Sequence, residues 1–236
     1  MKKVFFVGAG PGDPDLITVK GMDLVRNADV LVYAGSLVNP ALVERSSAGL
    51  KLDSQKMRLS VIADTLIAAA AEGKNVVRLH SGDPSLYGAI VEQIDLLRKA
   101  GIDVEIVPGV SSMFAAAAAL GTQLTLRGVS ESVVVTRPAG KTLEKDNIKE
   151  FSRIGGTMVI FLGSEAIGEV MNKVEYPPDT PVAIVFHASW PDQRILKGTV
   201  ADIAEKAAEA GIDHSALIVI GGVVDAKNFE ISRLYS

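Results

Sequence analysis

The chain opens with Met1-Lys2-Lys3-Val4-Phe5-Phe6-Val7-Gly8-Ala9-Gly10-Pro11-Gly12-Asp13-Pro14, and this stretch decides the fold class. An apolar run ends at Gly8 in a loop rich in Gly and Pro, and a helical pattern follows from Thr18 to Asn27. A strand, a glycine-rich loop and a helix in this order are typical of α/β domains. The basic start meets the loop too early for a signal peptide, so the apolar run is expected to form a first strand.

The same alternation continues through the first half of the chain. Apolar runs that end in Gly, Pro or Asp recur at 30–33, 76–79 and 104–107. Capping residues and apolar periodicity predict helices between and after these runs, at Thr18–Asn27, Ser60–Glu72, Tyr87–Ala100 and Ser111–Leu120. The first half is therefore predicted to be an α/β domain.

A second series of strands and helices follows a polar, weakly patterned stretch, Gly121–Gly128, which is suited to an interdomain connection. We place the boundary near Thr125 and predict two α/β domains, 1–125 and 126–236. Strands are expected at 132–136, 157–162, 182–187 and 216–221, with helices at 144–153, 164–174 and 200–210. The segment Arg194–Lys197 is expected to pair as an antiparallel edge strand.

Composition and charge narrow the class of partner. The sequence is 48% hydrophobic and 22% charged, as in an ordinary globular enzyme. A net charge of -4 gives no general attraction for nucleic acid or an anionic membrane, so a small-molecule partner is expected. The absence of cysteine excludes thiolate catalysis and disulfides and makes the cytoplasm the expected location. No stretch approaches the roughly 20 apolar residues that a membrane span needs.

The first loop is a poor match to the nucleotide-binding motifs. Asp13 stands where G-x-G-x-x-G has its third glycine, Pro11 lacks a backbone N–H, and no Gly-Lys-Ser/Thr follows. An acidic residue at this place also argues against a phosphate ligand. A tight structural turn is the alternative to a binding loop, and the loop alone does not decide between them.

Two further loops favour a binding site. Leu79–Gly88 and Val107–Ser112 each follow a predicted strand and precede a predicted helix. Gly82 permits a close backbone approach, and Asp83 offers a hydrogen-bond acceptor. Because open α/β sheets bind ligands beyond the carboxyl ends of their strands, three such loops are expected to line one rim. Neither serine of Ser111-Ser112 lies in the G-x-S-x-G setting of a hydrolase, so a serine triad is not expected.

Taken in order, these segments resemble the tetrapyrrole methylases over nearly the whole chain. The matching stretches are GAGPGDPDLIT from Gly8, GDPSLYG from Gly82, PGVSS from Pro108, FLG from Phe161, WPDQ from Trp190 and ALIVIGG from Ala216. Within that family, YAGSLV from Tyr33, TRPAGKT from Thr136 and SWPD from Ser189 look like the branch that methylates C11 of precorrin-4 or cobalt-precorrin-4.

The resemblance implies an enzyme that uses S-adenosyl-L-methionine to methylate a carbon of a corrin precursor, leaving S-adenosyl-L-homocysteine. It implies two α/β domains with the cofactor in the cleft between them, and commonly a homodimer. Pro11 and its loop would lie on the substrate side. The positions that match the family's cofactor contacts are Ser81, Gly82, Asp83, Leu86, Ser111, Ser112, Leu162 and Ala188.

Methyl transfer from a sulfonium needs positioning and exclusion of water rather than a protein nucleophile. Asp13 is the first candidate for a base, and helix capping is the alternative for the same carboxylate. The carboxylates of a corrin precursor need cationic donors, for which the candidates in predicted rim segments are Arg127, Arg137, Lys141 and Arg194. His80, His187 and His214 are too scattered for a metal site, so no protein-bound metal is expected. For His80 and His187, a structural role and a substrate contact stay open.

Three alternatives remain at this point. A family member could act on uroporphyrinogen III, on another precorrin carbon, or on a protein or RNA. A NAD-dependent oxidoreductase would fit the first strand and loop, although Pro11 and Asp13 count against it. A non-catalytic binding protein could also keep the fold. The sequence does not decide whether the substrate carries cobalt.

Overall fold

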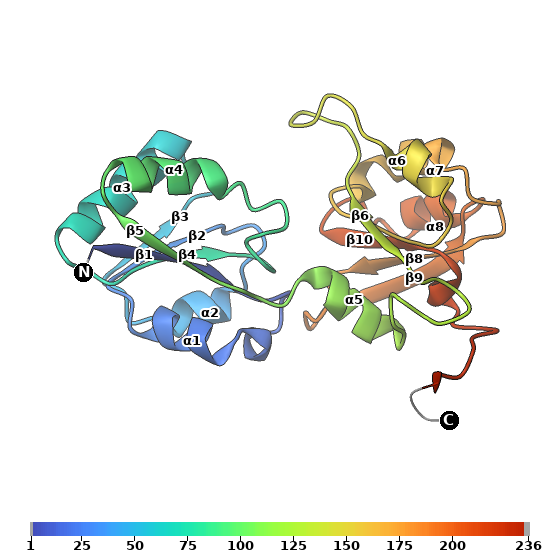
Figure 1. Ribbon diagram of the computed structural model, residues 1–236, viewed down its shortest axis with the longest axis horizontal. Coiled ribbons are helices and arrows are strands. Elements are labelled where there is room, and N and C mark those ends of the chain that lie inside the picture. The colour runs from blue at the N-terminus through green and yellow to red at the C-terminus, as the bar shows by residue number, and fades with distance from the viewer. Residues whose placement is uncertain (1, 234–236) are drawn as a thin grey trace. The chain divides into compact units, whose positions relative to one another are not determined.

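The computed structural model describes residues 2–233, which form two compact units, one extending to Ser112 and the other starting at Met113 (Figure 1). Each unit has its own five-stranded sheet. We predicted the boundary near Thr125, whereas the residues from 113 onward lie with the second unit. The physical reason is the alanine-rich helix α5 (Ser112–Leu120), whose small side chains pack on the core of the second sheet.

The first unit is built on a parallel sheet with the strand order β3-β2-β4-β1-β5. Its central strand β4 is buried along its whole length and lies between β1 and β2. Buried parallel strands are usually near-continuous apolar runs, and Val76, Val77 and Leu79 supply this pattern in β4 although the strand also buries Arg78 and His80. The strands are β1 (Lys3–Gly8), β2 (Val30–Tyr33), β3 (Leu50–Asp53), β4 (Val76–His80) and β5 (Asp103–Val107).

Helices cover both faces of this sheet (Figure 1). One face packs on α3 and α4 through Phe6, Leu66 and Leu97, and the other packs on α1 and α2 through Leu31 and Leu42. The side chain of Thr18 accepts a hydrogen bond from Gly21 N, which confirms the predicted cap of α1. The helices are α1 (Val19–Arg26), α2 (Pro40–Glu44), α3 (Leu59–Ala71) and α4 (Val91–Lys99).

The second unit has a mixed sheet with the order β6-β7-β10-β8-β9. Strands β6 and β7 are parallel, and β10 runs antiparallel to both β7 and β8. The predicted antiparallel edge is confirmed, because β9 pairs with β8 at the end of the sheet. The strands are β6 (Val133–Thr136), β7 (Thr157–Ile160), β8 (Pro181–Phe186), β9 (Arg194–Thr199) and β10 (Ala216–Ile220).

Two cores flank the second sheet. One holds Ile160, Ile184 and Ile218 under the helices α6, α7 and α8, and the other holds Val159, Val185 and the alanines of α5. Figure 1 shows α5 on the opposite side of this sheet from the other three helices. The bounds of those three are α6 (Ile148–Ser152), α7 (Ile167–Lys173) and α8 (Ile203–Glu209).

Several expected bounds were wrong at the ends. The helix predicted from Tyr87 begins at Val91, because Tyr87 and Ala89 adopt positive φ angles of 54° and 47° that cannot continue a helix. The helix predicted from Glu144 begins only at Ile148. Strand β3 and helix α2 were not predicted, since β3 is an exposed edge strand and α2 is a single short turn. Within residues 2–233, no helix is long and apolar enough to cross a membrane.

Candidate functional site

Three loops of the first unit meet at the carboxyl ends of β1, β4 and β5. The amide N–H groups of Gly10 and Gly82 donate to each other's carbonyl oxygens at 3.2 and 2.8 Å. A Cβ atom on Gly109 would lie only 2.2 Å from the carbonyl oxygen of Gly82 and 2.7 Å from Cα of Gly8. A Cβ atom on Gly8 would likewise lie 2.5 Å from Cα of Gly109, so the loops can approach this closely only because Gly8 and Gly109 are glycine. This juxtaposition confirms that the rim predicted from the sequence exists.

The Asp83 carboxylate ties two of these loops together. Oδ2 accepts a hydrogen bond from Gly109 N at 2.8 Å, and Oδ1 accepts one from Ser85 N at 2.8 Å and another from the Ser85 hydroxyl. These hydrogen bonds outweigh the partial burial of the carboxyl and lower the pKa of Asp83. The carboxylate is thus held ionised and fixed where the three loops meet.

The chemistry of the rim suits a neutral or cationic ligand better than a phosphate. Residues 8–14, 81–90 and 108–112 contain the two carboxylates of Asp13 and Asp83 and no lysine or arginine. A Cβ atom on Gly82 would meet nothing closer than Cα of Ser111 at 3.7 Å, so the backbone there is open to a close approach. Serine hydroxyls, backbone amides and a fixed carboxylate are the groups that hold amino, hydroxyl and purine functions. S-adenosylmethionine carries these functions and a positive sulfonium, so the donor set fits it.

The remaining predicted cofactor contacts of the first unit lie in the same loops. Ser81 and Leu86 are partly buried in the loop after β4, and Leu86 N donates to the Asp83 carbonyl. Ser111 is buried, and Ser112 is the first residue of α5. The structure therefore places Ser81, Gly82, Asp83, Leu86, Ser111 and Ser112 in two adjoining loops, and their contact with a cofactor stays a prediction.

Pro11 and Asp13 lie in the first of the three loops, after β1. Pro11 is buried. The Asp13 carboxylate accepts a hydrogen bond from Asp15 N at 2.9 Å and caps a short 3-10 helix, Pro14–Leu16. The capping role that we set against a catalytic one is thus present in the structure. A role for Asp13 as a base stays a prediction.

A cluster of buried polar side chains, Arg78, His80 and Gln93, lies on the α3–α4 side of β4. The sequence did not predict that these side chains lie together. Arg78 donates through Nε to Gln93 Oε1 at 3.2 Å and through Nη1 to the Val32 carbonyl at 3.4 Å. His80 is 5% exposed, its ring stacks with that of Phe6, and its buried Nε2 has no hydrogen-bond partner in residues 2–233. Burial, with the nearby charge of Arg78, lowers the pKa of His80 to about 3, so the imidazole is neutral.

In the second unit, another set of candidate residues lies at one edge of the sheet, the edge formed by the carboxyl ends of β6, β7 and β8. Ile160 of β7 and Ile184 of β8 both pair with Ile218, and Thr136 pairs with Ile160. Residues just beyond β6, β7 and β8 therefore leave the sheet at the same edge. This edge carries Arg137, Leu162, His187 and Ala188, and Arg194 at the start of β9 pairs with Phe186 there.

The backbone at this edge is strained. Leu162, His187 and Ser189 have φ angles of 54°, 46° and 69°, although none of them is glycine. Such angles persist only where the surroundings fix them, and they are concentrated at functional sites. Leu162, two residues beyond the buried strand β7, is also 62% exposed, whereas Ala188 is 5% exposed. Strain and exposure of this kind have no signal in the sequence.

The four predicted carboxylate-binding cations are not all in one place. Arg137 follows β6 and donates to the Thr142 hydroxyl at 2.7 Å, and Lys141 is exposed in the same loop. Arg194 lies 4.6 Å from the Phe186 ring centre and donates to the Ala210 carbonyl. Arg127 is ion-paired with Glu230 and precedes β6, at the opposite edge of the sheet. Three of the four thus share an edge, and Arg127 does not.

Two other features lie apart from these loops. A hollow of about 610 Å³ beside α1 is not lined by any of the predicted site residues; its walls are Phe5, Val19, Lys20, Asp23, Leu24, Asn27, Asn75 and Val77. Across the described chain, 2–233, no group of three or more His, Cys, Asp or Glu side chains is arranged to hold a metal ion.

The chain is similar to known proteins over almost its full length. Residues 3–204 match the family described as Tetrapyrrole (Corrin/Porphyrin) Methylases. A cobalt-precorrin-4 C(11)-methyltransferase of Methanocaldococcus jannaschii is 50% identical, over 99% of this chain and 93% of the relative. The precorrin-4 C(11)-methyltransferase of Pseudomonas aeruginosa is 46% identical, over 98% of this chain and 94% of the relative.

A solved structure agrees with these relatives. The crystal structure of a cobalt precorrin-4 methyltransferase, a cobalamin biosynthetic enzyme, superposes with a TM-score of 0.90 at 42% identity, covering 95% of this chain and 96% of that one. Two α/β units, glycine-rich loops at the strand ends and a family match over most of the sequence all agree. The chain therefore belongs to the tetrapyrrole methylases.

Proposed function

We propose that this protein is an S-adenosylmethionine-dependent methyltransferase of cobalamin biosynthesis that methylates C11 of precorrin-4 or cobalt-precorrin-4. Identity of 50% and 46% to relatives named for this reaction supports the choice of substrate class. The observation in this chain that carries the proposal is the junction of the three loops at Gly8, Gly82 and Gly109, fixed by Asp83.

The proposed cofactor is S-adenosyl-L-methionine, which supplies an activated methyl group when bound. Ser81, Gly82, Asp83 and Leu86 would hold it from the loop after β4, and Ser111 and Ser112 from the loop after β5. Leu162 and Ala188 of the second unit are the further proposed contacts. These residues position the reactants and exclude water, which is the main task in a displacement at an activated methyl.

The substrate would be recognised through its carboxylates. Arg137, Lys141 and Arg194 lie at one edge of the second sheet and are the proposed donors, with Pro11 on the substrate side of the first unit. Arg127 is the weakest of the four proposed donors because Glu230 neutralises it. Following the family resemblance, we also propose that the protein is cytoplasmic and that it forms a homodimer. Sedimentation velocity would test the homodimer.

Calorimetric titration with S-adenosylhomocysteine, beside NAD and ATP, tests the cofactor assignment. We expect saturable binding of S-adenosylhomocysteine alone. Asp83→Ala leaves two backbone N–H groups without their acceptor, and a loss of about 1–3 kcal/mol would weaken binding by roughly 5- to 150-fold. Asp15→Asn is the matched control, since that carboxylate is 79% exposed and pairs with Arg45 at the surface. Binding of NAD alone would overturn the proposal.

Methyl transfer to enzymatically prepared precorrin-4 and cobalt-precorrin-4, with uroporphyrinogen III as the competing substrate, tests the reaction. Mass spectrometry of the product reports one added methyl group, and carbon NMR with labelled methyl reports its position. Methylation of uroporphyrinogen III in place of both precorrins would replace the C11 assignment with the alternative within the family.

A further inference from the structure

The hairpin loop between β8 and β9, residues 187–193, carries a second polar group that the proposed function leaves unused. Both carboxylate oxygens of Asp192 lie close to His187 Nδ1, at 3.0 and 2.9 Å. The hydrogen bond from His187 is the main reason that the pKa of Asp192 is lowered. A carboxylate at Nδ1 fixes the neutral tautomer in which Nδ1 carries the proton and Nε2 offers a lone pair.

The imidazole is also held in position by aromatic rings. Its centre lies 3.9 Å from the Phe186 ring centre in a stacked arrangement and 5.2 Å from that of Trp190. Nδ1 points to Asp192, and Nε2 lies on the other side of the ring from this contact. The His187 side chain is 24% exposed, so its second nitrogen is within reach of a ligand at this edge.

The loop is built to keep this arrangement despite backbone strain. His187 N donates to the Ser215 carbonyl, Trp190 N donates to the His187 carbonyl, and Ser189 N donates to Gln193 Oε1 at 2.7 Å. These bonds hold the positive φ angles of His187 and Ser189, each of which costs about 1–3 kcal/mol. A backbone conformation that costs free energy and is nevertheless held by several hydrogen bonds indicates that the position of a side chain has been selected.

The charged groups around the imidazole are few. Asp192 is in contact with it, and Arg194 is near enough to Asp192 to help lower the pKa of that carboxyl. His214, two residues before β10, meets the Phe186 ring edge-on at 5.9 Å and is itself paired with Asp213. The pair His187 and Asp192 is thus distinct from a second, more exposed histidine–aspartate pair at the same edge.

We propose that His187, oriented by Asp192, is the proton acceptor of the methyl transfer. This inference rests on the proposed function. The electron-rich macrocycle carbon forms a bond to the methyl carbon, and the carbon–sulfur bond breaks with its electron pair going to sulfur. The macrocycle is left with a positive charge, which it loses by giving up one proton to His187 Nε2. The Asp192 carboxylate stabilises the resulting imidazolium, which returns the proton to water.

The pH dependence of the turnover number separates this role from a structural one. A positioned base contributes roughly 10²–10⁴-fold, so His187→Gln is expected to lower kcat by about 100-fold or more and to abolish the acid limb of the pH profile. Asp192→Asn is expected to lower kcat less, because the imidazole stays but loses the carboxylate that orients it. Binding of S-adenosylhomocysteine and the melting temperature should stay near those of the wild type in both variants.

His214→Gln is the matched control, because it removes a neighbouring aspartate-paired imidazole from the same edge. It is expected to keep both the rate and the acid limb. If His187→Gln keeps the acid limb and turns over within about threefold of the wild type, the inference is overturned. If His187→Gln fails to fold, Asp192→Asn decides: a kcat equal to that of the wild type overturns the inference. A wild-type protein that binds S-adenosylhomocysteine but methylates no tetrapyrrole would instead overturn the proposed function.

Discussion

At the scale of single residues, glycine decides whether the three loops can meet. Gly109→Ala would bring a Cβ atom against the Gly82 carbonyl and the Gly8 backbone, and neither can move without shifting a strand end. Overpacking of this kind costs about 1–3 kcal/mol, so we expect a lower melting temperature and roughly tenfold weaker binding of S-adenosylhomocysteine. Differential scanning fluorimetry and calorimetry measure the two effects.

Gly49→Ala is the control for that substitution. A Cβ atom on Gly49 would meet nothing within 4 Å, and its φ angle is not positive. It should therefore leave both melting temperature and binding close to those of the wild type. Normal binding by Gly109→Ala would show that the loop junction is not part of the cofactor site.

The sequence predicted which residues lie at this loop junction, but it did not predict all the contacts that they make there. The glycines and Asp83 stand directly after predicted strands, and parallel strands bring their carboxyl ends to one edge, so their meeting could be predicted. The partner of Asp83, the backbone N–H of Gly109, could not, because 26 residues separate the two and the contact depends on loop geometry. The burial of His80 and the strain at Leu162 and His187 likewise follow from tertiary packing alone.

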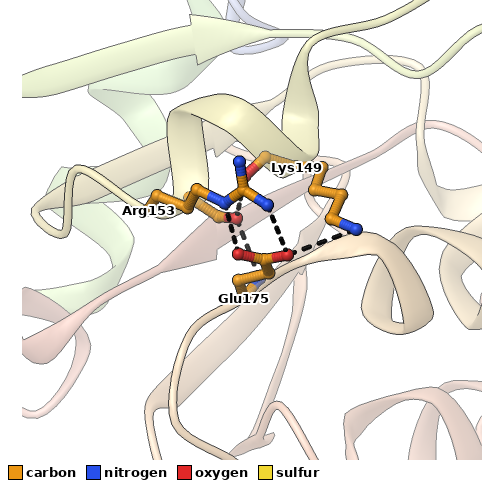
Figure 2. A network of polar contacts seen from close by, with 4 residues as sticks. Lys149, Arg153 and Glu175 are labelled. Carbon is orange, nitrogen blue, oxygen red and sulfur yellow. Dashed lines mark hydrogen bonds and ion pairs between the residues drawn. The ribbon is translucent and has the colours of Figure 1, made fainter.

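At the scale of elements, an ion-pair network joins α6 to the segment after α7 (Figure 2). The Glu175 carboxylate accepts hydrogen bonds from Arg153 Nε and Nη2 and lies 3.3 Å from Lys149 Nζ. The hydrogen bond from Arg153 is the largest of the effects that lower the pKa of Glu175 to about 2. All three side chains lie at the surface, so their contribution to stability should be screened by salt.

Glu175→Gln is therefore expected to lower the melting temperature at low ionic strength, and the difference from the wild type should shrink in about 1 M salt, where the Debye length is about 3 Å. Because the pKa of Glu175 is lowered by folding, its contribution is present above about pH 4.5 and is lost as the pH falls towards 2. Asp95→Asn is the control, because it breaks an ion pair that lies within α4 and does not connect α4 to another element. If the difference in melting temperature between Glu175→Gln and the wild type does not change with salt, the effect arises from packing and not from the ion pairs.

The prediction of elements was good where the core supplied the pattern. The buried strands and α1 were predicted because apolar runs and caps mark them, whereas α4 began four residues later than its periodicity suggested. Ile90 packs in the same core as the apolar side chains of α4, but the positive φ angles of Tyr87 and Ala89 take the backbone before it out of the helix. Helix α5 has an apolar composition that fits either core, so its attachment to the second sheet was not visible in the sequence.

At the scale of the whole molecule, two separate cores imply that the two units can respond differently to pH. His80 is buried in the first unit with its pKa lowered from 6.5 to about 3. Between these pH values the unfolded chain binds a proton at His80 and the folded unit does not. Protonation of His80 therefore favours unfolding. The free energy of unfolding of the first unit is at its full value above about pH 6.5 and declines as the pH falls towards 3. The decline is about 1.4 kcal/mol per pH unit for one proton.

His80→Phe is expected to remove this dependence, because phenylalanine can stack on Phe6 and needs no hydrogen-bond partner. Between pH 7 and pH 5 the first unit of the wild type should lose about 2 kcal/mol more of its free energy of unfolding than the variant does. The single tryptophan, Trp190, lies in the second unit, so its fluorescence follows that unit while circular dichroism follows both. Urea unfolding by the two probes separates the transitions, and His214→Gln controls for an exposed imidazole. An equal loss in wild type and His80→Phe would mean that His80 is hydrated in solution and that the acid sensitivity of the first unit arises elsewhere.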